Sequence, residues 1–320
     1  MTTRKTKIAV GLSGGVDSSV AAALLHEQGH EVIGIIMEIF DGSVGVKESA
    51  RHACYGPGEK GDVEAAASVC HTFGIPFHVI DLKKEYRSHV LEYFRGEYLA
   101  GRTPNPCIVC NQRLSKDQTY FLYALTQKQI LQTIFPLGGY TKQQVRKIAG
   151  SLGLETAIRP ESQDFIAGGD YSPLFNDEEI EEGDIVDEKG NIIGKHRGII
   201  HYTVGQRKGL GIASGRPLYV LKIDAHNNRI VVSDRESLFS EGLIAKDLNL
   251  IAMKTLDLPH DVQVKIRINH TAADATLFPH ERSKARILFK EPQMALTPGQ
   301  SAVFYSGDTV LGGGVIEKAF

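Results

Sequence analysis

A six-residue segment, Ser13-Gly14-Gly15-Val16-Asp17-Ser18, follows an apolar run over residues 8–12 and precedes a helical pattern. Two adjacent glycines let the backbone turn tightly and approach a ligand closely, because neither carries a Cβ atom. The first N–H groups of a helix have no partner inside the helix, so they point at whatever lies in the turn. Serine hydroxyls add hydrogen-bonding groups, and the Asp17 carboxylate suits Mg²⁺ beside a phosphate. The sequence therefore predicts a strand, a phosphate-binding turn and a helix.

The spacing of this segment disfavours two common nucleotide-binding motifs. It lacks the spaced glycines and terminal Lys-Ser/Thr of a Walker A loop, and the Gly-x-Gly-x-x-Gly of a dinucleotide-binding fold. It resembles the pyrophosphate loop of the ATP-pyrophosphatase superfamily, whose members activate a carbonyl oxygen by adenylating it. We call residues 13–18 the PP-loop. The superfamily contains amidotransferases, synthetases and thiolases, so the acceptor stays open at this point.

Composition sets broad limits on the protein class. A chain of 320 residues with 42% hydrophobic content can form two or three domains. No apolar run approaches the length of a membrane span, and the N-terminus leads directly into a strand, so we expect a cytoplasmic protein without membrane association. Four cysteines in that compartment favour metal ligation or nucleophilic chemistry over disulfides. A net charge of −2 argues against a basic coat but allows local RNA-binding patches.

Strands alternate with helices in the first hundred residues, which predicts an α/β doubly wound parallel sheet with ligands at the carboxyl ends of its strands. Met37 lies at such an end, where its side chain packs either against a purine or within the core. The expected strands are Glu31–Met37 and Pro76–Asp81, and the expected helices are Asp62–Phe73, ended by Gly74, and Lys84–Leu99.

The later sequence changes character twice. Residues 117–154 read as helical, and Asn176–Asp184 reads as an acidic surface or linker. Short alternating strands separated by Gly, Asn and Asp then predict a small all-β barrel or a pair of barrels. The clearest helices are Gln118–Ala124 and Lys142–Leu152, the latter with Thr141 as N-cap and Gly153 as C-cap. The expected strands are Ile192-Ile193, Leu218–Ile223, Arg229–Val232, Val262–Ile268, Lys284–Phe289 and Gln300–Tyr305.

The four cysteines differ in their surroundings. Cys107 and Cys110 form a Cys-x-x-Cys pair in a proline-rich loop, which suits a redox pair, half of a metal site or a nucleophile with a helper. Cys70 lies on the apolar face of a predicted helix and is expected in the core. Cys54 lies in a turn-rich loop after a strand, which favours a ligand.

Five motifs occur in an order that resembles the bacterial tRNA-specific 2-thiouridylase family, MnmA, over the whole chain. This resemblance implies an ATP-dependent tRNA-uridine 2-sulfurtransferase, which adenylates O2 of the wobble uridine (uridine 34) and replaces that oxygen with sulfur, releasing AMP and pyrophosphate. The β region argues against a small-molecule amidotransferase or synthetase. The motifs are SGGVDSSVAA, GRTPNPCIVCN (Gly101–Asn111), KDQTYFLY (Lys116–Tyr123), HYTVGQRKGLGI (His201–Ile212) and TPGQSAVFYSGDTVLGGGVIE (Thr297–Glu317).

The resemblance assigns roles to particular residues and divides the chain into three domains. It implies a shortened PP-loop ATP-binding catalytic domain (1–115), a mainly helical central tRNA-binding domain (116–182) and a β-barrel C-terminal region (183–320). The partners implied are the tRNA anticodon stem-loop and a sulfur donor, either a sulfur-relay protein, a cysteine desulfurase or free sulfide. ATP with Mg²⁺ is expected on Gly11, Leu12, Ser13, Gly14, Gly15, Val16, Asp17, Ser18 and Met37; tRNA on Asn105, Pro106, Cys107, Lys116, Asp117, Gln118 and Arg267; and catalysis on Cys110 as nucleophile, Cys107 and Asp17.

One departure from the family pattern concerns sulfur delivery. The family commonly carries a second catalytic cysteine in a Glu-Ser-Gln-(Asp/Glu)-x-Cys-Phe-Ile context, and residues 161–166 here read ESQDFI without it. Cys54, Cys107 and Cys110 could instead bind a [4Fe–4S] cluster with one open iron. The alternatives are a persulfide on Cys110 resolved by an external thiol, and a zinc site made of all four cysteines.

A second departure concerns length. After Arg113 the family continues through several tens of residues before its Lys-Asp-Gln motif, whereas this chain reaches Lys116 almost at once. Loss of a strand there would expose a sheet edge and apolar surface. A catalytically impaired relative that still binds tRNA is therefore an alternative function. We expect the aromatic series Tyr120, Phe121 and Tyr123 to serve helix packing rather than base stacking.

Overall fold

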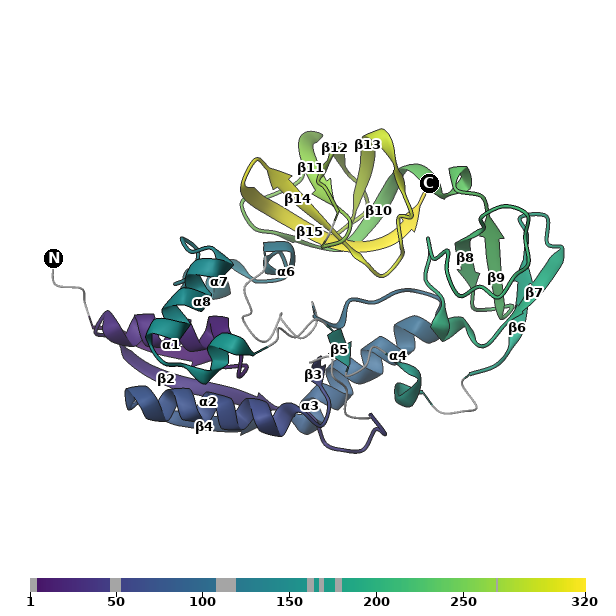
Figure 1. Cartoon of the computed structure of the whole chain (residues 1–320). Helices are drawn as coiled ribbons and strands as arrows, with labels where there is room; N and C mark the ends of the chain where they lie inside the picture. Colours follow the sequence, from purple (N-terminus) through teal and green to yellow (C-terminus); the bar gives the residue numbers. More distant parts are fainter. Residues whose placement is uncertain are drawn as a thin grey trace. The chain divides into compact units, whose positions relative to one another are not determined.

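The computed structural model describes residues 5–46, 53–107, 119–159, 164–166, 170–175, 180–268 and 270–320 (Figure 1). These residues form two compact units. The first unit contains the described residues up to His89 together with those from Thr133 to Pro173, and the second contains the others. None of the helices in these residues combines the length and apolar character that a membrane span requires. The predicted domain boundaries after residues 115 and 182 stay a prediction.

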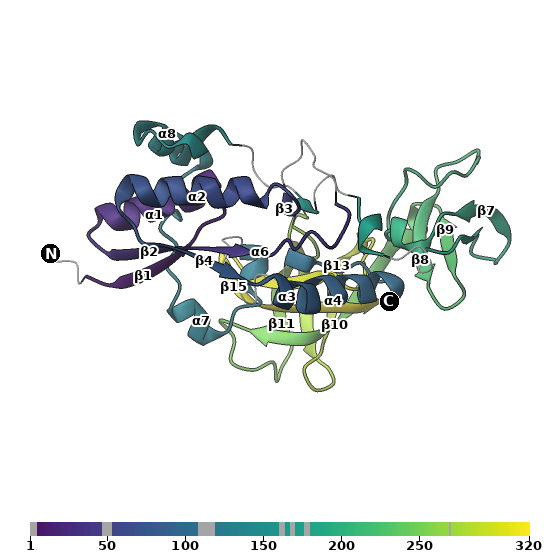
Figure 2. The same ribbon diagram turned by 90° about the horizontal axis from the view of Figure 1, so that it is seen from below.

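A three-stranded parallel sheet organises the first unit, as the alternation of strands and helices predicted. Its order is β1-β2-β4, with β2 in the middle. Helices α1 and α2 lie on the same side of these strands (Figure 2). The bounds are β1 (Lys7–Gly11), α1 (Val16–Glu27), β2 (Glu31–Glu38), α2 (Glu59–Phe73) and β4 (Phe77–Asp81).

The core of this unit forms where alternate strand residues meet the two helices. Gly34 lets α2 approach the sheet, because a Cβ atom at Gly34 would collide with the sulfur of Cys70. The prediction that Cys70 is a core residue is confirmed, since it is 1% exposed. The core residues are Val10, Leu12, Ala22, Leu25, Val32, Ile36, Ala66, Cys70 and Ile75.

The outer parts of this sheet are only partly covered. Within the described residues, β1 pairs with β2 alone, so its other edge has no strand partner. On β4, Val79 and Ile80 are 45% and 41% exposed although both are apolar. An open edge and exposed apolar side chains are the features expected of a sheet that lacks a neighbouring strand.

The remaining helices follow the predicted pattern with local differences. Helical structure runs from Lys83 to Leu99 but contains a π-helical turn, and Gly74 ends α2 in the left-handed region at φ +64°. Thr141 caps α8 in a reciprocal capping box with Gln144, as its position predicted. The bounds are α3 (Lys83–Tyr86), the π turn (Arg87–Leu91), α4 (Glu92–Leu99), α6 (Thr119–Leu122), α7 (Gln127–Leu131), α8 (Lys142–Ser151), the paired short strands β3 (Ala53–Tyr55) and β5 (Asp164–Ile166), and 3₁₀ turns at Glu155–Ile158, Ser172–Leu174, Ile199–His201 and Glu236–Leu238.

The second unit contains a four-stranded sheet in the order β7-β6-β9-β8. The predicted acidic linker is wrong at its end: Gly183 and Asp184 begin β6, and the Asp184 carboxylate pairs with Lys195 Nζ at 2.6 Å on the neighbouring strand. This cross-strand pair explains why an acidic residue is tolerated there. The bounds are β6 (Gly183–Val186), β7 (Ile192–His196), β8 (Tyr219–Asp224) and β9 (Arg229–Ser233).

A closed six-stranded barrel completes the second unit and confirms the predicted C-terminal β-barrel. Its strand order is β10-β13-β12-β11-β14-β15, and closure leaves no open edge. Tyr120 and Tyr123 of α6 are each 3% exposed and bond to Ser301 of the barrel, which confirms their packing role; the side chain of Phe121 lies outside the described residues. The bounds are β10 (Phe239–Leu250), β11 (His260–Lys265), β12 (Ala273–Pro279), β13 (Ala285–Met294), β14 (Ser301–Ser306) and β15 (Thr309–Ala319).

Candidate functional site

The PP-loop connects the carboxyl end of β1 to the first turn of α1. The Leu12 N–H donates to the Ile35 carbonyl at 2.7 Å, which continues the β1–β2 pairing beyond the strand. Gly14 has φ +67°, and Gly15 is the N-cap of α1 with an extended backbone. Because the N-cap is a glycine, no side chain caps α1. A bound anion can therefore accept hydrogen bonds from the N–H groups of the first turn.

Hydroxyl groups close the PP-loop on itself. Ser18 Oγ accepts from the Ser13 N–H at 3.2 Å, and Ser19 Oγ donates to the Gly15 carbonyl at 2.8 Å. Leu12 and Val16 are each 3% exposed, so only their backbone groups can face a ligand. The predicted ATP-binding residues between Gly11 and Ser18 therefore lie together in one strand–turn–helix connection, as the sequence indicated.

Gly14 is required by the close approach of α2. A Cβ atom at this position would lie 2.8 Å from both the Cα atom and the carbonyl oxygen of Asp62, and 2.7 Å from Arg159 Nη1. The positive φ of Gly14 independently disfavours any other residue. The turn is thus packed against the first part of α2 rather than hanging free.

Two basic side chains beside the PP-loop were not predicted from the sequence. Lys142 Nζ lies 2.6 Å from Asp17 Oδ2, and Arg159 Nη1 donates to the Gly14 carbonyl at 2.9 Å. The second guanidinium nitrogen of Arg159 lies 3.0 Å from Asp62 Oδ1. The position of Lys142, directly after a recognisable N-cap, was the only local signal; nothing local marks Arg159.

The end of β2 is where the predicted adenine-side residue lies. Met37 is half-buried there and pairs in register with Ile80 of β4. The chain beyond it is held by the Glu59 carboxylate, which accepts N–H bonds from Ile39 at 2.6 Å and Phe40 at 3.1 Å. Burial raises the pKa of Glu59, although these two backbone bonds oppose the shift.

The three described cysteines form no disulfide. Cys54 on β3 is exposed, whereas Cys107 is half-buried and packs against the cluster containing Tyr120 and Tyr123. Burial raises the pKa of the Cys70 thiol, and its position in the sheet core disfavours Cys70 as a metal ligand. No group of three metal-ligating side chains forms within the described residues, which do not include Cys110.

Two motifs that are far apart in the sequence meet in the second unit. The Thr103 N–H donates to the Pro298 carbonyl at 2.9 Å, and Gln300 Nε2 donates to the Thr103 carbonyl at 2.9 Å. Gly299 allows this contact, because a Cβ atom there would lie 2.9 Å from the same carbonyl oxygen. The turn before β14 therefore anchors the proline-rich loop that carries Asn105, Pro106 and Cys107.

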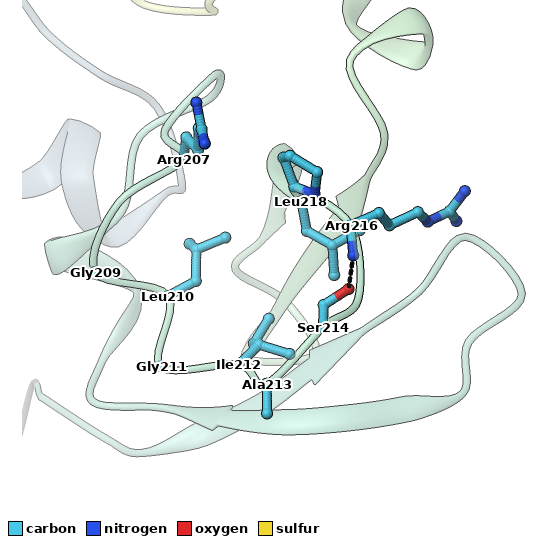
Figure 3. A pocket seen from close by; sticks show the side chains of 10 residues that line it. Arg207, Gly209, Leu210, Gly211, Ile212, Ala213, Ser214, Arg216 and Leu218 are labelled. Carbon is cyan, nitrogen blue, oxygen red and sulfur yellow. Dashed lines mark hydrogen bonds between the residues drawn. The ribbon is translucent and has the colours of Figure 1, made fainter.

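The residues predicted to contact tRNA are not all described. Lys116, Asp117 and Gln118 lie outside the described residues. Arg267 is half-buried and donates to the Met294 carbonyl at 3.0 Å, a contact that also serves the barrel. In the same unit, the turn after His201 surrounds a shallow hollow of about 480 Å³ (Figure 3). It is lined by Arg207, Gly209, Leu210, Gly211, Ile212, Ala213, Ser214, Arg216, Pro217 and Leu218.

Comparison with known proteins identifies the family. Three family models match in order: the tRNA methyl transferase HUP domain at residues 6–115 and 113–167, the tRNA methyl transferase PRC-barrel domain at 176–234, and the aminomethyltransferase beta-barrel domain at 240–316. The tRNA-specific 2-thiouridylase MnmA of Acetivibrio thermocellus is 44% identical, covering 98% of this chain and 99% of that relative. The chain belongs to the MnmA family. The MnmA of Clostridioides difficile is 41% identical, covering 98% of each chain.

The same comparisons bear on the length of the MnmA chain described here. The alignment with the Acetivibrio thermocellus MnmA spans 360 positions, 40 more than the 320 residues of this chain. The HUP-domain model matches in two pieces that meet at residues 113–115. That junction is the place where the sequence indicated a missing segment, directly after Arg113.

Proposed function

We propose that this protein is an ATP-dependent tRNA-uridine 2-sulfurtransferase. It adenylates O2 of uridine 34 in the anticodon stem-loop of its tRNA substrates and replaces that oxygen with sulfur, releasing AMP and pyrophosphate. The observation that carries the proposal is a complete PP-loop, uncapped by any side chain, in a chain that aligns with MnmA relatives over 98% of its length. We place the reaction in the cytoplasm.

ATP binding is assigned to the PP-loop and to Met37. The uracil oxygen is a poor leaving group, and transfer of AMP to it makes it a good one, while the pyrophosphate departs at Ser13–Ser18. The Asp17 carboxylate is 56% exposed beside the loop and is an oxygen ligand of the kind that Mg²⁺ prefers, so it would hold this ion against the phosphates. The ion would supply charge neutralisation there.

Sulfur delivery is assigned to Cys110, with Asn105, Pro106 and Cys107 beside the target base. Two routes fit a chain without the second family cysteine. In one, a persulfide on Cys110 attacks C2 of the adenylated uridine, and an external thiol completes sulfur release. In the other, Cys54, Cys107 and Cys110 hold a [4Fe–4S] cluster, for which three thiolates are a suitable donor set. Iron and acid-labile sulfide assays after anaerobic purification separate these routes, since stoichiometric iron supports only the second.

The tRNA is expected to contact Lys116, Asp117, Gln118 and Arg267. The sulfur donor is a relay protein, a cysteine desulfurase or sulfide itself. To test the function, purified protein is incubated with Mg·ATP, unmodified tRNA and one of two sulfur sources: sulfide for the cluster route, or a cysteine desulfurase with cysteine and an external thiol for the persulfide route. Digested nucleosides are analysed by mass spectrometry. We expect 2-thiouridine with wild type, none with Cys110→Ala, and none on a tRNA whose wobble base is cytidine. Absence of 2-thiouridine with every sulfur source would refute the proposal.

A catalytically impaired tRNA-binding relative is the second candidate. The observation that favours it is the three-stranded sheet, in which β1 carries the PP-loop and has no partner on its outer edge among the described residues. This candidate predicts tight tRNA binding without AMP or pyrophosphate release. The same incubation therefore distinguishes it from the first, because AMP formation is measured alongside 2-thiouridine.

A further inference from the structure

Two basic side chains from the last part of the first unit reach the PP-loop. Lys142 opens α8 and Arg159 follows a 3₁₀ turn, so both come more than 120 residues after the loop in the chain. Arg159 is committed to structure, because its guanidinium bridges the Gly14 carbonyl and the Asp62 carboxylate. Lys142 Nζ contacts the Asp17 carboxylate, which is an exposed part of the loop.

Packing fixes the place of Lys142. Val145 and Ala149, on the same face of α8, lie in one apolar cluster with Val16 and Val20 of α1. The capping box at Thr141 fixes the first turn of α8, which is where Lys142 lies. The stem of Lys142 is therefore held beside the first turn of α1, while its side chain keeps 38% of its surface exposed.

The charges at this position matter for an anion. Asp17 alone would repel a pyrophosphate group bound at the start of α1, and the ammonium of Lys142 cancels that charge at 2.6 Å. If a divalent cation takes the Asp17 carboxylate, phosphate oxygens next to the loop can replace that carboxylate as a partner of the same ammonium. A lysine ammonium is a mobile point charge suited to such an exchange.

We propose that Lys142 is a phosphate-binding residue of the PP-loop, which exchanges the Asp17 carboxylate for phosphate oxygens when Mg·ATP or Mg·pyrophosphate binds. This inference rests on the proposed function of the PP-loop as the ATP site. It adds to the ATP site a phosphate-binding side chain from α8, which lies outside the strand–turn–helix motif.

The first test is calorimetric binding of Mg·ATP and Mg·pyrophosphate. A lost charge-assisted contact of this kind corresponds to roughly 10-fold weaker binding or more. We expect Lys142→Met to weaken both ligands by about that factor and Lys142→Arg to restore most of it. Lys147→Met, on an exposed position of the same helix, should change neither affinity. Circular dichroism and the urea-unfolding midpoint check that each variant keeps the helix content and stability of the wild type.

The second test is a double-mutant cycle with pyrophosphate in the absence of metal. Asp17→Asn removes the carboxylate that neutralises Lys142, so we expect it to bind metal-free pyrophosphate more tightly than wild type does. The gain should disappear in the Asp17→Asn, Lys142→Met double variant. Equal affinities of wild type and Lys142→Met for Mg·ATP would overturn this inference and leave the ATP site standing. Failure of the wild type itself to bind Mg·ATP would overturn both.

Discussion

Replacing Gly14 with alanine will destabilise the first unit and weaken anion binding at the PP-loop. At φ +67°, an L-residue costs about 1–2 kcal/mol relative to glycine. The added Cβ atom would also lie 2.8 Å from two backbone atoms of Asp62, which cannot move without shifting α2. Overpacking of this kind costs about 1–3 kcal/mol. We therefore expect Gly14→Ala to lower the free energy of unfolding by roughly 2–5 kcal/mol.

Gly29 offers a matched control for this prediction. It also has a positive φ, +84°, but no atom lies within 4 Å of the place where its Cβ would be. Gly29→Ala should therefore show only the backbone strain, about 1–2 kcal/mol. Urea unfolding followed by circular dichroism at 222 nm suits the comparison, because the first unit contains α1, α2 and α8, the three longest α-helices of the described chain.

The two variants separate the contact with α2 from the strain of the turn. We expect Gly14→Ala to lose about 1–3 kcal/mol more than Gly29→Ala, and only Gly14→Ala to lose affinity for Mg·pyrophosphate. Equal losses of stability would show that the approach of α2 does not constrain the loop. Unchanged pyrophosphate affinity in Gly14→Ala would refute the idea that this turn sets the geometry of the anion site.

Three further predictions concern groups outside the PP-loop. Ser301→Ala should cost about 1–3 kcal/mol in urea unfolding, because it leaves the buried Tyr123 hydroxyl without the partner at 2.8 Å; a neutral result would contradict the packing role of that tyrosine. Burial lowers the pKa of His196, so its contribution to stability is fully present above pH of about 6.5 and is lost as the pH falls below it; His196→Gln should flatten the urea midpoints measured between about pH 7 and pH 5. Iodoacetamide on the native protein should alkylate exposed Cys54 and spare buried Cys70, as read by peptide mass spectrometry.

Local signals in the sequence predicted the parts of the fold that depend on neighbouring residues. The glycine pair, the apolar strand before it and the helix after it are contiguous, so the PP-loop could be placed from the sequence. Thr141 was identified as an N-cap because a capping threonine directly precedes the helix it caps; the reciprocal bond from Gln144 was found in the structure. The pairings of Lys142 with Asp17 and of Arg159 with Gly14 could not be predicted, because they join residues 125 and 145 positions apart.

Two strands that were not predicted, β6 and β15, contain residues that are unfavourable in strands. β6 begins with Gly183 and Asp184, which are unfavourable in strands unless a neighbouring strand supplies compensation, here Lys195. β15 contains three consecutive glycines, and a Cβ atom on Gly313 would lie 2.6 Å from the ring of Tyr123. Glycine is needed there because α6 packs closely on the barrel, a reason that becomes visible only in three dimensions.

In the first unit, one side of the proposed adenylation site is built by described residues, whereas the other side, beyond β1, has no described strand. In open parallel sheets, ligands bind at the carboxyl ends of strands where the strand order reverses, and two neighbouring strands supply the two walls of the crevice. The wall formed by β1, α1 and α8 has all of its parts here. The N-terminus of α1 has no side-chain cap, and the PP-loop packs against α2. Lys142 and Arg159 supply two positive charges beside the loop. The outer side of β1 has no strand within the described residues, and the family model breaks at residues 113–115. Phosphate binding should therefore depend on groups that this chain retains, so a loss of ATP turnover with retained pyrophosphate affinity would point to the missing segment rather than to the PP-loop.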